Sequence, residues 1–156
     1  MRWWYVAAAA LLGCSSPQAT NGDAGALASI GADFVQKRGC PTCHQPADAH
    51  TMLAGNLAAV RGTLAFPANL TPDRTTGIGG WADLQIIRAF RYGVDASNVE
   101  LCPTMPRFAD IGDVEASAIV AYLRSLPAVT RPIPPSMCPP IKPAPGADLA
   151  MPPTDL

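Results

Sequence analysis

The stretch Cys40-Pro41-Thr42-Cys43-His44 constrains this chain more than any other. It places two thiols three positions apart, with a histidine directly after the second. Such a pair occurs in dithiol redox centres, as half of a zinc site, and in the C-x-x-C-H sequence to which a haem is attached covalently. A dithiol centre usually lies in a βαβ unit, and a zinc site needs a second pair of ligands farther along the chain. Neither feature is found, so the motif favours one covalent c-type haem, with His44 as the proximal iron ligand.

The N-terminus has the form of a bacterial export signal. Arg2 precedes an apolar stretch, Trp3–Leu12, that is too short to span roughly 30 Å of hydrocarbon as a helix. Leu11–Cys14 resembles a lipobox, so we expect residues 1–13 to be a signal peptide and Cys14 to carry a lipid anchor. An ordinary cleaved signal with a chance cysteine is the alternative. Residues 14–24 are polar and small, which predicts a flexible tether.

Apolar residues at helical spacing predict a helix before the motif and another near residue 120. Gly39 ends the first helix directly before Cys40, and Asp113 can cap the last one, which runs from Val114 to Leu126 and stops at Pro127. The apolar faces are Leu27, Ile30, Gly31, Phe34 and Val35 on the first helix, and Ile119, Tyr122, Leu123 and Leu126 on the last.

A third helix is predicted from Trp81 to Gly93, with Leu84, Ile87 and Phe90 near one side. Residues 45–80 and 95–106 are broken by glycine and proline and predict loops, with a short helical turn at 56–60. No stretch alternates like a strand, so the predicted fold class is all-α. Loops this long are unusual in a bare helical bundle, but they suit a chain that wraps a large apolar ligand.

Together with Cys40–His44, two further motifs resemble class I c-type cytochromes. Asn69–Trp81 contains Asn-Leu-Thr-Pro-Asp and Thr-Gly-Ile-Gly-Gly-Trp, similar to monohaem domains of dehydrogenase-associated cytochromes. Met105-Pro106 stands before the last helix. The resemblance implies a class I cytochrome c domain over residues 25–127, whose first and last helices cross. It leaves residues 128–156 as a proline-rich tail. The glycines of the second motif are expected to let the backbone approach a flat ligand.

The resemblance assigns the distal iron ligand to Met105. His50 and Met52 follow His44 too closely along the chain to reach the other haem face easily, and Met137 and Met151 lie in the proline-rich tail. A methionine that fills a gap in the core is the ordinary alternative for Met105.

Three other residues have expected roles beside the haem. The indole N–H of Trp81 can contact a haem propionate, or it can bond a carbonyl of the core instead. Cys102 and Cys138 can form a disulfide in an oxidising compartment, which would tie the tail over the Met105 loop. Two unpaired thiols are the alternative.

The resemblance implies a one-electron carrier, because His/Met ligation leaves no open coordination position. The chain shows no catalytic base or nucleophile constellation, so no enzymatic activity of its own is expected. A formal net charge of −1 without a basic stripe predicts no nucleic-acid partner. The expected partners are a dehydrogenase, other cytochromes or an oxidase, on the periplasmic side of a bacterial membrane. A haem enzyme or gas sensor with a labile distal ligand is the alternative.

Overall fold

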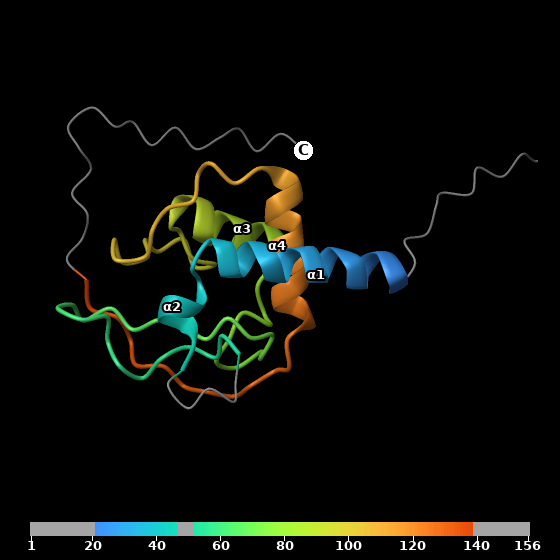
Figure 1. Ribbon diagram of the computed structural model, residues 1–156. Helices are drawn as coiled ribbons and strands as arrows, with labels where there is room; N and C mark the ends of the chain where they lie inside the picture. The colour runs from blue at the N-terminus through green and yellow to red at the C-terminus, as the bar shows by residue number, and fades with distance from the viewer. Residues whose placement is uncertain (1–20, 47–51, 139–156) are drawn as a thin grey trace, which may run out of the picture.

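The computed structural model describes residues 21–46 and 52–138, and these form a helical body without strands (Figure 1). The predicted signal peptide, the first part of the tether and residues 139–156 lie outside the described residues. The rest of the predicted tether, residues 21–24, is not a tether but the start of the first helix. Four helices are present in the described part: α1 (Asn21–Lys37), α2 (Pro41–His44), α3 (Asp83–Tyr92) and α4 (Asp113–Ser125). The all-α prediction is confirmed for these residues, with one short helix more than the three expected. None of the described helices is long and apolar enough to cross a membrane.

The body is organised by the crossing of α1 over α4 (Figure 1). Gly31 lies at the point of closest approach, where a Cβ atom would overlap the carbonyl oxygen of Ala118. Val35 and Leu123 are buried in the core beside this crossing. The predicted contact face is therefore correct except at Ile30, which is 49% exposed. Successive residues of an α-helix are about 100° apart, so Ile30 lies off the contact that Gly31 faces.

The end of α1 is fixed by an ion-pair network and by a change of backbone direction. The guanidinium of Arg38 donates to both carboxylate oxygens of Glu115, at 2.7 and 3.0 Å, and to Asp110 at 2.7 Å. Gly39 has a φ of +74°, a conformation that favours glycine, and the Cys40 N–H bonds the Val35 carbonyl at 3.2 Å. The chain thus turns directly from a packed helix into the Cys40–His44 motif.

Helix α3 bears out the predicted face only in part, since Phe90 is buried and Ile87 packs against the core but Leu84 does not. Its buried residues are Ile86, Ala89 and Phe90, whereas Leu84 is 65% exposed. The backbone shows the reason, because the Phe90 carbonyl accepts a hydrogen bond from the Phe108 N–H at 2.9 Å and so brings the following loop onto this side. The predicted end is correct, since Gly93 has a left-handed φ of +71° and follows the last helical residue.

Two local predictions were wrong. Asp113 does not cap α4 but is its first residue, and its carboxylate pairs with Arg91 at 2.8 Å instead. The turn expected at 56–60 is not helical, because the Asn56 side chain accepts from the Ala58 N–H at 3.0 Å and the Val60 N–H bonds the Ala65 carbonyl at 2.8 Å.

The first part of the predicted proline-rich tail belongs to the body. After α4 the chain runs back along the loop of residues 64–76 (Figure 1), and we call residues 129–138 the strap. The Val129 carbonyl accepts from Asn69 Nδ2 at 2.7 Å, and the Met137 N–H donates to the Leu64 carbonyl at 3.0 Å. The described body therefore extends well beyond Pro127.

Candidate functional site

An apolar cavity of about 560 Å³ lies between the helices and the long loops. The residues that the sequence assigned to a haem line it together: Cys40, Cys43, His44, Trp81 and Met105. A volume of this size is typical of a cofactor site. Most of the remaining wall is apolar and includes Val35, Leu70, Ile78, Phe90, Ile119 and Leu123. The cavity thus explains why loops this long pack around a sparse helical core.

One wall of the cavity carries the motif on a single helical turn. Pro41 begins α2, where its missing N–H costs no hydrogen bond, and the His44 N–H closes the turn on the Cys40 carbonyl at 3.1 Å. This turn places Cys40, Cys43 and His44 on one side. Both thiols are free and half-buried. Burial raises the pKa of the Cys40 thiol, which is not the environment of an activated thiolate in a dithiol redox centre.

His44 is held in the tautomer that an iron ligand requires. Its Nδ1 lies 2.8 Å from the Ala68 carbonyl oxygen. Because a carbonyl only accepts, Nδ1 carries the proton, and the lone pair lies on Nε2. Burial lowers the pKa of the imidazole, and the bond to Ala68 opposes this shift only in part. His44 is therefore a buried, neutral imidazole with its coordinating nitrogen unprotonated.

Met105 is the one candidate for the distal ligand that lines the cavity among the described residues. Its side chain is half-buried and packs against the core cluster. Met52 and Met137 are 41% and 65% exposed and do not line the cavity. His50 and Met151, the remaining candidates, lie outside the described residues.

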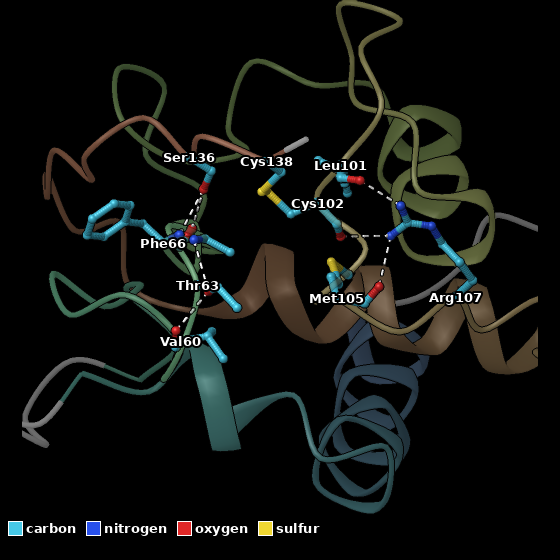
Figure 2. Close-up of a disulfide and its surroundings, with 10 residues drawn as sticks. Val60, Thr63, Phe66, Leu101, Cys102, Met105, Arg107, Ser136 and Cys138 are labelled. Atoms are coloured by element: carbon cyan, nitrogen blue, oxygen red, sulfur yellow. Dashed lines mark hydrogen bonds between the residues drawn. A yellow bond between two sulfur atoms is a disulfide. The ribbon is translucent and has the colours of Figure 1, made fainter. Parts of the chain in front are cut away.

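The loop that carries Met105 is held by an arginine that sequence analysis missed. Arg107 donates to the carbonyls of Leu101 at 2.7 Å, Met105 at 2.9 Å and Cys102 at 3.4 Å (Figure 2). Its guanidinium lies against Gly93, where a Cβ atom would overlap it. Gly93 thus ends α3 and also makes room for Arg107. Bonds from a side chain to distant carbonyls have no sequence periodicity, so no pattern could have revealed this role.

Cys102 and Cys138 are joined by a disulfide in the structure, with their Cα atoms 5.5 Å apart (Figure 2). The Met105 N–H bonds the Cys102 carbonyl at 3.1 Å. The bridge therefore attaches the end of the strap three residues before the candidate ligand.

The Asn69–Trp81 segment folds tightly on itself. The buried Asn69 accepts from the Thr71 N–H at 3.0 Å and the Thr71 hydroxyl at 2.8 Å. A Cβ atom at Gly77 or Gly79 would overlap the carbonyl oxygen of Thr71 or Pro72, respectively. The glycines are thus needed where the chain packs against itself, and Gly77 also lines the cavity, so the expected approach of the backbone to a flat ligand stays a prediction.

Trp81 is half-buried and lines the cavity. Its backbone carbonyl accepts from Arg124, which also donates to the Ile78 carbonyl at 3.1 Å and to Asp83 at 3.1 Å. Within the described residues the indole N–H has no acceptor, so the alternative bond to a core carbonyl is not found there. Arg124 is a second positioning residue that sequence analysis missed.

No protein-family model matches the chain. Several curated proteins are similar to it. The gluconate 2-dehydrogenase cytochrome c subunit of Pantoea cypripedii is 32% identical over 100 residues, which is 62% of this chain and 22% of the relative. A diheme cytochrome c-type protein of Cereibacter sphaeroides is 30% identical over 112 residues, or 67% of this chain and 38% of the relative.

The fructose dehydrogenase cytochrome subunit of Gluconobacter japonicus is 31% identical over 88 residues, which is 54% of this chain and 18% of that protein. The chain thus spans between 18% and 38% of the length of these three relatives. Their similarity supports a cytochrome c family for this chain.

Proposed function

We propose that the chain is a class I c-type cytochrome that carries single electrons between redox proteins. One observation carries the proposal: Cys40, Cys43, His44 and Met105 line the same apolar cavity, although Met105 is far from the motif in sequence. Two thiols and a neutral imidazole on one helical turn suit covalent attachment and proximal ligation. A thioether in the lining suits the distal position.

The residues present fit a covalent haem c. Cys40 and Cys43 would hold the ring, and His44 and Met105 would coordinate the iron. When bound, the haem supplies an iron that cycles between its ferric and ferrous states. Ala68 orients the imidazole, the apolar lining excludes water, and the indole N–H of Trp81, which has no acceptor among the described residues, is a donor for a propionate.

The way the Met105 loop is held fits electron transfer better than it fits substrate binding at the iron. The loop before α4 is held by Arg107 and by the Cys102–Cys138 disulfide, which favours a methionine that stays in place. A labile ligand would instead suit the alternative, a haem enzyme or gas sensor. With Met105 held in place, the chain is instead an electron carrier with no catalytic residues of its own.

The names of the relatives suggest the partners of this carrier. Gluconate 2-dehydrogenase and fructose dehydrogenase cytochrome subunits are among them. A dehydrogenase is accordingly the proposed electron donor, and another cytochrome or an oxidase is the acceptor. The site of action is the periplasmic face of a bacterial membrane, with Cys14 as the lipidated residue. A Cys14→Ser variant should leave the membrane fraction, and an unchanged membrane fraction would count against the anchor.

The ligand assignment is tested by the spectrum of the oxidised holoprotein. His/Met-ligated ferric haem has a weak far-red charge-transfer band, which Met105→Ala should abolish. Met52→Ala removes an exposed methionine outside both the cavity and residues 129–138 and is the matched control, so it should keep the band. The ferrous wild-type protein should be indifferent to CO. Survival of the band in Met105→Ala, or a ready shift with CO in the wild type, would support the enzyme or sensor alternative.

A further inference from the structure

The strap is anchored at both ends to the loop of residues 64–76. At its start, the Val129 N–H donates to the Thr71 hydroxyl at 3.2 Å, and the Val129 carbonyl accepts from Asn69 at 2.7 Å. Near its end, the Ser136 hydroxyl accepts from the Phe66 N–H at 2.8 Å and donates to the Phe66 carbonyl at 3.3 Å (Figure 2). These contacts involve the backbone or buried side chains of the loop, so they fix its path.

The anchors lie on either side of the residue that orients His44. Phe66 and Asn69 bond the strap, and Ala68 between them accepts the Nδ1–H of the imidazole at 2.8 Å. Anything that loosens the strap therefore loosens the segment that sets the direction of the His44 ring.

The far end of the strap reaches the Met105 side of the cavity. Ser136 bonds Phe66, and two residues later Cys138 is bridged to Cys102 (Figure 2). The Cys102 carbonyl in turn accepts from the Met105 N–H at 3.1 Å. Only one residue, Met137, separates the contact with the His44 side from the covalent bond to the Met105 side.

We propose that the strap is a positioning element that couples the two walls of the cavity and holds Met105 in reach of the iron. The inference rests on the proposed haem function and adds the element that sets how firmly the distal position is closed. With the bridge intact, the Met105 loop cannot move away unless the Phe66–Ser136 contact also moves. Without the bridge, the strap stays bonded to the loop of residues 64–76, and the Met105 loop is held only by Arg107.

The test compares external ligand binding in strap variants of the ferric holoprotein. Cys102→Ser/Cys138→Ser should raise the rate at which imidazole displaces the distal ligand by about tenfold, since a covalent tether is removed. Ser136→Ala should raise this rate severalfold while the bridge is intact. The same change should add nothing in the bridge-less background, because the two act as one unit. Ser97→Ala, an exposed serine away from the strap, should bind imidazole at the wild-type rate.

A second measurement on the same holoprotein does not depend on the iron spectrum and separates this proposal from the proposed function. Hydrogen exchange at the Met105 and Phe66 N–H groups should accelerate in Cys102→Ser/Cys138→Ser and at Phe66 in Ser136→Ala. If the bridge-less protein does not fold, Ser136→Ala alone decides the matter. Wild-type exchange and wild-type imidazole rates in the strap variants would overturn the coupling. Absence of the far-red band from the wild-type holoprotein would overturn the His/Met assignment, whatever the exchange data show.

Discussion

His44 and Met105 line the same cavity, but the chain holds them by different means. His44 lies on a helical turn directly after α1, is only 9% exposed, and bonds a backbone carbonyl. Met105 lies in a half-buried loop outside any helix, held by Arg107 and by a disulfide three residues away. One candidate ligand is thus positioned by helix packing and the other by cross-links. From this contrast we expect that the Met105 side can be loosened without unfolding the His44 side.

The largest change in stability is expected at the crossing of α1 and α4, which supports the whole helical body. Gly31→Ala places a methyl group on the Ala118 carbonyl at the crossing of α1 and α4, so the free energy of unfolding should fall by about 3 kcal/mol. Gly25→Ala is the control in the same helix, because a Cβ atom there meets nothing within 4 Å. It should stabilise by roughly 0.5–1 kcal/mol. Equal stabilities in denaturant titrations of the two variants would refute the close crossing.

A smaller effect should be confined to the His44 side. Asn69 is 2% exposed and bonds Thr71, Thr76 and Val129, so Asn69→Ala should cost about 2–3 kcal/mol by leaving these groups without partners. Asn56→Ala removes one exposed bond and should cost well under about 1 kcal/mol. Chemical denaturation of both variants checks the difference. A neutral Asn69→Ala would mean that the loop does not depend on this side chain.

Arg107→Ala should act mainly on the Met105 side. Three loop carbonyls lose their donor, so we expect a loss of about 1–2 kcal/mol in unfolding free energy and a weaker far-red band. Arg61→Ala removes an exposed arginine from a different loop, between α2 and α3, and should change neither the unfolding free energy nor the band. A strong band in Arg107→Ala would show that the disulfide alone holds the loop.

The smallest expected effect is a pH dependence at the end of α1. The hydrogen bond from Arg38 lowers the pKa of Glu115 below its ordinary value of 4.5. The stability from this pair is therefore complete above about pH 5 and is lost as the pH falls through the lowered value. Wild type and Glu115→Gln should differ at pH 7 and converge in acid. Asp33→Asn removes an exposed carboxylate without touching Arg38, and a convergence of the same size there would remove Arg38 from the explanation.

Much of the helical framework was predictable, because the sequence signals of a helix lie within the helix and at its ends. Apolar spacing and the glycines at 39 and 93 located α3, α4 and the end of α1 within a few residues, whereas α1 begins at Asn21, inside the predicted tether. The exposed Ile30 and Leu84 were misplaced, because periodicity does not say which neighbour a face will meet. The end of α3 was predicted correctly because Gly93 is a local signal. The whole of its buried face could not be predicted, because it depends on the loop around Phe108, which follows later in the chain.

The Cys40–His44 motif was predictable from its spacing and Met105 from the resemblance, but the residues that support them were not. Cys40–His44 and Met105 carry chemistry that is visible in the sequence. The strap has no period because its prolines exclude helix, and Arg107 and Arg124 act on carbonyls far along the chain. Long-range bonds of this kind become visible only when the fold brings their partners together.

The most direct test of the central claim is the haem content of the protein matured in a host that attaches c-type haem. Denaturing mass spectrometry of the wild type should show one haem bound covalently per chain. Cys40→Ser/Cys43→Ser should show none, whereas Cys102→Ser/Cys138→Ser should retain it. A wild-type chain without covalent haem, or a haem that survives the loss of Cys40 and Cys43, would contradict the account.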